Sequence, residues 1–408
     1  MPTRPVIGAV ALVALVVFVG GVTVGALVVA DDAGDDEGSG SAADGTTATA
    51  ERPRAERTPP VSIAPASPME DVPHADPERG SRRGSPLDEL PAGVTALTDF
   101  GQRPDWSPDG SEIVFLDNSP VGDVWTVDVA TRATRRLTDR FEHRGFSRAA
   151  YLSSGDLLLC GPTSGPAPTS ERPEAGRFTG VLSVLRAPFD EPPQPLGIPC
   201  WEGIATARTS MRIAWNRSDI DYTDSDLVDR VVNGITEVWT GEIRDIDGRA
   251  TVVNAHKVLD RDAFGSLAVF EVQAFRPPGE NELLLTAYAY QGGEVIGLDL
   301  DTGLVRNYSN SSAYEEAEGI APDGDAIYVE RDIAYEGVDP GALDVWRLGL
   351  RDPSDPSWER VTFFNRYAPY YASNPSVAPD GQTLAFQLSI NGDVEGQGDG
   401  ILLLDLTE

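Results

Sequence analysis

Histidine and cysteine are scarce in this chain, with three histidines and two cysteines among 408 residues. His74 lies in a Pro-rich segment, so only His143 and His256 remain for a folded domain. A three-histidine metal site therefore cannot be built there, and two cysteines are too few for a structural zinc site. We expect neither a bound metal nor another cofactor.

Basic residues are also few. Lys257 is the only lysine, and 32 basic residues face 65 acidic ones, for a net charge of −33. Because nucleic acids bind to basic faces, this balance excludes them as expected partners. It also disfavours polyanionic substrates.

Recognisable catalytic motifs are missing as well. There is no Gly-x-Ser-x-Gly sequence of the kind that carries a nucleophilic serine in α/β-hydrolases. Glu315, Glu316 and Glu318 offer paired carboxylates, but neighbouring glutamates are expected in so acidic a chain. We favour solvated surface groups over an acid/base pair and assign no catalytic residue.

What is present begins with an apolar run from Val6 to Ala30. As a helix it would span ~37 Å, enough to cross a bilayer. A signal peptide cleaved after Ala30 is the alternative, but such cores usually hold only ~7–15 apolar residues. Arg4 before the run and acidic residues after it favour a single-pass anchor in the cell membrane, with an extracytoplasmic C-terminal domain.

Residues 31–90 contain no Phe, Tyr or Trp and are rich in Pro, Ser, Ala, Gly and acidic residues. Such a segment buries too little apolar surface to offset the entropy of ordering. We expect 1–30 to be a transmembrane anchor, 31–90 a disordered linker, and 91–408 the folded domain.

The folded domain is repetitive. Trp106-Ser107-Pro108-Asp109-Gly110 precedes two alternating strands, Glu112–Phe115 and Asp123–Val129, and then Arg136-Leu137-Thr138. The Pro-Asp-Gly element supplies a tight turn between alternating apolar strands, which predicts a β-meander. Weaker copies recur every ~40–60 residues, a spacing typical of the four-stranded blades of a β-propeller. Six units fit between Val94 and the C-terminus.

The Ser-Pro-Asp-Gly, Asp-Val-Trp and Arg-Leu-Thr elements resemble the WD-like repeat of TolB-like six-bladed β-propellers, over about the last three quarters of the chain. The tail from Glu359 to Leu406 is similar to uncharacterised bacterial envelope members of that group. The resemblance implies an all-β fold of four-stranded antiparallel blades. It says little about function, because such propellers serve as docking scaffolds, lyase platforms and peptidase lids.

Two pairings follow from the repeat. Gly93–Thr98 reads like the fourth strand of a blade, so we expect it to complete the last blade and close the ring. Cys160 and Cys200 fall in adjacent blades, where they form either a disulfide or two separate small apolar side chains.

Topology also predicts one loop-rich end. The Pro-Asp-Gly turns mark one end of the propeller, and the long insertions gather at the other: Gly161–Gly180, Arg217–Thr236, Arg331–Leu343 and Ser389–Asp399. The segments that lead into the blades gather there too and supply the candidate binding residues His143, Arg144, Trp201, Glu202, Tyr314, Glu315, Glu316, Glu318, Tyr367, Tyr370, Tyr371 and Asn374. Aromatic rings beside charged groups suit a sugar or a peptide, although the same rings would also pack beneath their own loops.

Two functions stay open at this point. The first is a monomeric, membrane-tethered module that binds an envelope protein, peptide or glycan at the loop-rich end. The alternative is a carbohydrate-active enzyme, a lyase or glycosidase, with carboxylates in the central funnel.

Overall fold

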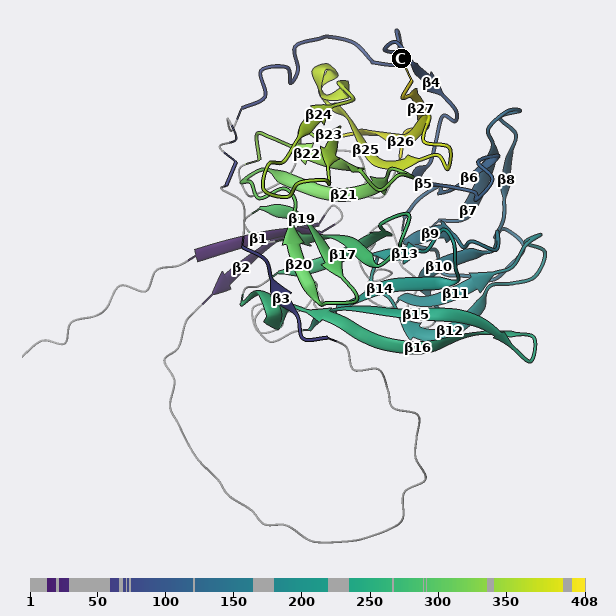
Figure 1. Cartoon of the computed structure of the whole chain (residues 1–408). Helices are drawn as coiled ribbons and strands as arrows, with labels where there is room; N and C mark the ends of the chain where they lie inside the picture. The colour runs from purple at the N-terminus through teal and green to yellow at the C-terminus, as the bar shows by residue number, and fades with distance from the viewer. Residues whose placement is uncertain are drawn as a thin grey trace, which may run out of the picture.

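The structure is a computed structural model, and it describes residues 13–19, 22–28, 59–65, 69–70, 72, 75–119, 122–163, 180–218, 235–265, 268–288, 290, 292–335, 341–391 and 398–407. These residues form β-strands and two 3-10 turns, η1 (Arg261–Phe264) and η2 (Phe364–Tyr367) (Figure 1). The all-β expectation is confirmed for this part of the chain.

Four of the sheets are separate and have four antiparallel strands each. The first comprises β5 (Gln102–Trp106), β6 (Glu112–Leu116), β7 (Val124–Asp128) and β8 (Thr134–Arg136). The second comprises β9 (Arg148–Tyr151), β10 (Leu157–Pro162), β11 (Gly180–Leu185) and β12 (Gln194–Pro199). The third comprises β13 (Ile204–Thr206), β14 (Arg212–Ser218), β15 (Thr236–Ile246) and β16 (Arg249–Asp260). The fourth comprises β25 (Tyr370–Val377), β26 (Thr383–Ile390), β27 (Ile401–Asp405) and β4 (Val94–Ala96).

A fifth sheet has nine strands rather than four. Its members are β17 (Val269–Phe275), β18 (Glu282–Tyr288), β19 (Gly293–Asp299), β20 (Leu304–Asn307), β21 (Tyr314–Ile320), β22 (Ala326–Asp332), β23 (Asp344–Gly349), β24 (Trp358–Arg360) and β3 (Ser62–Ile63). A single parallel pair, Gly293 with Tyr314, joins β19 to β21. The backbones approach this closely because Gly292 has no side chain: a Cβ there would lie 2.3 Å from the Ala313 carbonyl oxygen. The repeat predicts separate four-stranded units. The described residues contain four such units, and the strands from β17 to β24 share the nine-stranded sheet.

The first strands of these runs lie side by side in a closed order: β5, β9, β13, β17, β21, β25 and again β5. The chain is thus a β-propeller, with the first strands around a central channel. The first strands β5, β9, β21 and β25 each lead into a tight turn, as at Gly110, where the Gly110 amide donates to the Ser107 carbonyl at 2.9 Å. The φ of +74° at Gly110 favours glycine at this position.

The predicted ring closure is confirmed. β4 pairs antiparallel with β27, with Thr95 opposite Leu403 and Val94 opposite Leu404 (Figure 1). The core nearby joins neighbouring sheets, since Leu97, Phe115 and Ala385 share one buried cluster. The segment before the first blade therefore completes the last one and removes two open edges.

The N-terminal apolar run takes a different form from the expected transmembrane helix. Val13–Val19 (β1) and Val22–Val28 (β2) pair as antiparallel strands. A Val-rich sequence favours strands because β-branched side chains fit the extended backbone. Within the described part of the chain, no helix has the length and apolar character that crossing a membrane requires. The membrane anchor stays a prediction.

The expected linker also differs from expectation where it is described. Residues 31–58 lie outside the described residues, but the described residues between 59 and 90, here called the strap, contact the propeller. β3 pairs with β20, the Gly80 amide donates to the Asn365 carbonyl at 2.9 Å, and Val72 is only 2% exposed. The strap passes over the sheets of β21–β27 before it reaches β4 (Figure 1). The composition of the strap does not reveal these contacts, because they are backbone hydrogen bonds and ion pairs with Arg331 and Arg360 rather than apolar packing.

Candidate binding site

A cavity of about 420 Å³ lies in the channel, and its lining includes residues of all the first strands, β5, β9, β13, β17, β21 and β25. Pro108, Pro277, Pro322 and Pro379, which belong to the turns between first and second strands, also line it. The cavity therefore lies toward the turn end of the channel, opposite the loop-rich end expected from the sequence.

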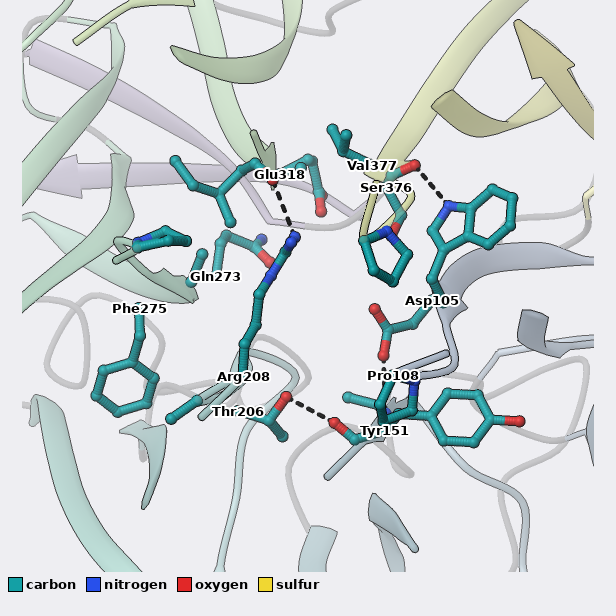
Figure 2. A pocket seen from close by; sticks show the side chains of 18 of the residues that line it. Asp105, Pro108, Tyr151, Thr206, Arg208, Gln273, Phe275, Glu318, Ser376 and Val377 are labelled. Atoms are coloured by element: carbon teal, nitrogen blue, oxygen red, sulfur yellow. Dashed lines mark hydrogen bonds between the residues drawn. The ribbon is translucent and has the colours of Figure 1, made fainter. Parts of the chain in front are cut away.

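Asp105 and Arg208 extend into this cavity from different sheets (Figure 2). Asp105 Oδ2 accepts a hydrogen bond of 2.7 Å from the Tyr151 amide. Burial raises the pKa of Asp105 to about 6, although that hydrogen bond and the charge of Arg208 act against the rise. The cavity thus holds a carboxylate that titrates close to neutral pH.

Arg208 has more donors than partners among the described residues. Its Nη2 donates to the Ile320 carbonyl at 3.0 Å, and no ion pair within 4.0 Å is formed by this guanidinium in the described part. Burial lowers the pKa of Arg208, and Asp105 and Glu280 only partly counteract that effect. A guanidinium with spare donors in a confined space is suited to bind a carboxylate.

Arg103, Arg148, Glu318 and Asn374 line the inner part of the cavity. Together with polar neighbours further along the channel they form a set of charged and polar side chains, here called the channel layer: Arg103, Arg148, Glu202, Glu271, Glu316, Glu318, Glu330 and Asn374. Arg148 forms a short ion pair with Glu271, and its Nη1 donates to Asn374 Oδ1 at 3.3 Å. Arg103 forms a short ion pair with Glu202. Burial alone would lower the pKa of Arg148, but the charges of Glu271, Glu318 and Glu202 outweigh it and raise the pKa.

Three carboxylates of the channel layer gather at one point. One oxygen each of Glu316, Glu318 and Glu330 lies within 4.8 Å of the others. Burial raises the pKa of Glu316 to about 7 and those of Glu318 and Glu330 well above the ordinary value. Repulsion from Glu316 adds to the rise in the pKa of Glu318 and of Glu330, and repulsion from Glu271 adds to the rise in the pKa of Glu316.

Four of the residues singled out from the sequence meet in the channel layer, namely Glu202, Glu316, Glu318 and Asn374. The expectation that the glutamates are solvated surface groups is wrong, because Glu315 and Glu316 are 0% and 7% exposed and the Glu318 side chain is 7% exposed. Glu316 and Glu318 are buried because alternate residues of β21 point into the channel, whereas Glu315 lies on the other face of the strand and is buried against Arg331.

The remaining residues singled out from the sequence lie elsewhere. Trp201 and Tyr314 are buried, and the Tyr314 hydroxyl donates a short hydrogen bond to Glu316. Glu315 Oε1 instead accepts from Arg331 Nε at 2.9 Å. Another group is only half-buried and lies outside the cavity lining: His143, Arg144, Tyr367, Tyr370 and Tyr371.

His143 and Tyr367 each contact a residue outside the cavity lining. His143 Nε2 lies 2.9 Å from Asp123 Oδ1, and the Tyr367 hydroxyl accepts from Arg82 of the strap at 3.0 Å. Part of each long insertion expected to build the loop-rich end lies outside the described residues, in 164–179, 219–234, 336–340 and 392–397. Binding at that end stays a prediction.

Several cavity and channel residues were missed by sequence reasoning: Arg103, Asp105, Arg148, Arg208, Glu271, Gln273 and Glu330. A signal for some of them exists in the repeat. Arg103, Arg148 and Asn374 each stand seven residues before the turn glycine of their own blade, Gly110, Gly155 and Gly381. Equivalent positions of a propeller repeat meet at the channel, so aligning the repeats on this glycine predicts the layer.

The two cysteines are bonded. Cys160, on β10, and Cys200, directly after β12, form a disulfide that closes a loop with a sequence separation of 40. The bond lies in a buried cluster with Leu158, Leu182 and Trp215.

Three solved structures with a similar fold are distant from this chain in sequence. The putative TolB from Agrobacterium tumefaciens is 15% identical, with a TM-score of 0.45 over 65% of this chain and 77% of that one. A gluconolactonase from Xanthomonas campestris is 14% identical, with a TM-score of 0.46 over 84% and 97%. The acylaminoacyl peptidase of Pyrococcus horikoshii is 12% identical, with a TM-score of 0.41 over 71% of this chain and 41% of that one. No protein-family model and no curated protein matches the sequence. The propeller assignment rests on the sheet topology of the chain itself.

Proposed function

We propose that this propeller is a binding module that holds a carboxylate-bearing peptide segment in the cavity at the turn end of its channel. The main support is the pair formed by Arg208 and Asp105, which present a guanidinium and a carboxylate to one cavity of about 420 Å³. That volume falls within the ~300–1,000 Å³ typical of small-molecule sites. A peptide has a carboxylate that Arg208 would bind and N–H groups that would donate hydrogen bonds to Asp105.

The lining favours a peptide over a glycan. Sugars are commonly held by aromatic rings with an open face, but Trp106, Tyr151 and Phe275 are each less than a tenth exposed. Proline rings from the turns provide the apolar surface instead. Such a surface suits aliphatic side chains.

The carboxylates of the channel layer offer less support for a glycosidase. Inverting enzymes hold their two carboxyl groups ~6.5–9.5 Å apart to admit a water molecule, and retaining enzymes hold a single pair ~5–5.5 Å apart. Glu316, Glu318 and Glu330 bring oxygens within 4.8 Å and are crowded as a triple. Binding therefore remains the favoured function.

We further propose that the nine-stranded sheet comprises two blades, β17–β20 and β21–β24, because each is an antiparallel run of four like the separate sheets. The propeller would then have six blades, as the TolB-like repeat implies. The apolar run at residues 6–30 supports placement of this module in the cell envelope as a membrane-anchored protein. The disulfide gives further support, since such bonds persist in oxidising compartments.

The test is fluorescence polarisation of the full chain with a library of labelled tripeptides, each with a free or an amidated C-terminus. We expect Arg208→Gln to weaken binding of the free-acid peptides at least roughly 10-fold, since charge-assisted hydrogen bonds contribute about 1.5–3 kcal/mol. Arg140→Gln is the matched control, because Arg140 is an exposed arginine with a single ion pair to Asp190. Equal binding by both variants would refute the site.

The loop-rich end is tested in the same assay. Replacing Tyr370 and Tyr371 with Ala should leave tripeptide binding unchanged, because neither residue lines the cavity. If this double variant lost binding while Arg208→Gln kept it, the ligand would lie at the opposite end of the propeller.

A further inference from the structure

The channel layer has a surplus of negative charge. It contains five carboxylates, those of Glu202, Glu271, Glu316, Glu318 and Glu330, against the two guanidiniums of Arg103 and Arg148. Glu202 and Glu271 are each taken up by one arginine. Among the described residues Glu316 and Glu330 form no ion pair, and Glu318 has only Arg148 at 3.8 Å, which is already bound to Glu271. Buried charges without a close counter-charge are costly.

Glu318 is the least satisfied of the three. Its side chain is 7% exposed, and its Oε1 atom accepts no hydrogen bond from the described residues. The nearest cationic atom, Arg148 Nη2, is 3.8 Å away and already donates to Glu271. An oxygen buried in this way, aimed at two further carboxylates, calls for a positively charged ligand.

Glu316 and Glu330 keep acceptor capacity as well. Glu316 Oε2 accepts from the Tyr314 hydroxyl, and Glu330 Oε1 accepts from the Asn374 amide at 2.6 Å. A carboxylate has about four lone-pair sites, so each can still coordinate an ion. These hydrogen bonds also fix the carboxylates in place without neutralising them.

We propose that Glu316, Glu318 and Glu330 form a calcium-binding site at the floor of the cavity. All available ligands are oxygens, which hard cations such as Ca²⁺ prefer over softer metals. Two oxygens on opposite sides of Ca²⁺ at ~2.4 Å lie ~4.8 Å apart, so three oxygens that all lie within 4.8 Å of one another are close enough to bind one such ion. Mg²⁺ demands near-octahedral geometry and usually keeps several waters, so a cluster of three protein carboxylates suits Ca²⁺ better.

The cavity provides the route to this site. Glu318 lines the cavity, whereas Glu316 and Glu330, which are 7% and 4% exposed, lie outside its lining. An ion entering from the turn end would reach Glu318 first. The proposed calcium site is independent of the peptide proposal, because it uses neither Asp105 nor Arg208.

The experiment is calorimetric titration of the chelator-treated full chain with CaCl₂, with thermal unfolding in parallel. We expect one saturable site and a rise in Tm of roughly 3–6 °C at about 100-fold excess over Kd. Glu318→Gln and Glu330→Gln should each weaken binding at least 10-fold while keeping the side-chain shape. Glu359→Gln, at an exposed glutamate on β24, should bind as the wild type does.

Two results would overturn the site: no saturable binding by the wild type up to about 1 mM Ca²⁺, or wild-type affinity in both channel variants. A measurement on the wild type alone guards against misfolded variants. Tb³⁺ bound at Glu316 would be excited through the adjacent Tyr314 ring, and Ca²⁺ should displace this emission. Emission that Ca²⁺ does not displace would also contradict the proposal.

Discussion

Arg331 Nη2 donates a hydrogen bond of 2.7 Å to Oε2 of Glu70, although the two residues are 261 positions apart in the chain. The same guanidinium lies 3.9 Å from the centre of the Trp358 ring and is 2% exposed. The strap thus supplies a counter-charge to an arginine inside the propeller. The strap belongs to the folded unit, so its removal should destabilise the propeller.

Asp76 provides the sharpest test of the strap. Its carboxylate is 3% exposed, forms an ion pair with Arg360 at 3.2 Å, and accepts from Asn365 Nδ2 at 2.9 Å. Asp76→Asn should lower the free energy of unfolding by about 1–3 kcal/mol in urea denaturation, because it removes one partner of a buried pair. Glu89→Gln, at an exposed strap position, should change it little. Identical curves for both variants would indicate a strap that contributes nothing.

Truncation separates the strap from the ring closure. A chain that starts at residue 91 should fold with a reduced Tm, since it loses the strap but keeps β4. A chain that starts at residue 100 should lose the cooperative transition, because the edge of β27 is then open and Leu97 no longer fills its core cluster. Near-ultraviolet circular dichroism during heating measures both. Equal melting of the two chains would contradict the role assigned to β4.

The disulfide gives a third prediction. Replacing Cys160 and Cys200 together with Ala should destabilise the protein by about 3–4 kcal/mol, as expected for a closed loop of this length. A reductant should lower the stability of the wild type by the same amount in thermal unfolding, and it should leave the double variant unchanged. Titration of the denatured, unreduced protein should find no free thiol; two thiols per chain would exclude the bond.

Stability should also depend on pH through Glu294, which is 0% exposed. Burial, with the charge of Glu315, raises the pKa of Glu294 from 4.5 to about 8. Between these values the folded protein holds a proton that the unfolded chain has lost, so stability falls as pH rises.

The matching variant is Glu294→Gln, which keeps the shape of the side chain and cannot ionise. The difference in Tm between wild type and variant should therefore grow in favour of the variant from pH 5 to pH 8. At pH 5 both proteins carry a neutral group at this position. A difference that stays constant with pH would show that Glu294 has the same pKa in the folded and the unfolded protein, and would contradict the raised pKa.

Local sequence signals predicted the fold because they act within a few residues. The turn at Ser107–Gly110 and the alternation of Glu112–Phe115 specify β6 and its neighbours, and the same kind of pattern identified β4 as the closing strand. The strap could not be recognised in this way. Glu70 and Asp76 are ordinary acidic residues until Arg331 and Arg360 are placed beside them.

The site was predicted only in part for a related reason. Glu316 and Glu318 drew notice as a cluster in the sequence, but their burial depends on β21 being an inner strand. Asp105 and Arg208 meet only because β5 and β13 border one channel, and nothing local to either residue signals that meeting. Aligning the repeats on the turn glycine identifies Arg103, Arg148 and Asn374 from the sequence alone, and only those three residues of the site.

The pairing of β4 with β27 also has a mechanical consequence. A pull on the chain from its N-terminal side would load the strap first, at its hydrogen bonds to η2 and its ion pairs with Arg331 and Arg360. Only after these contacts had ruptured would the force reach β4 and draw it off the last sheet. The strap and the closing strand β4 therefore bear such a force one after the other, and the contacts of the strap break before the ring opens.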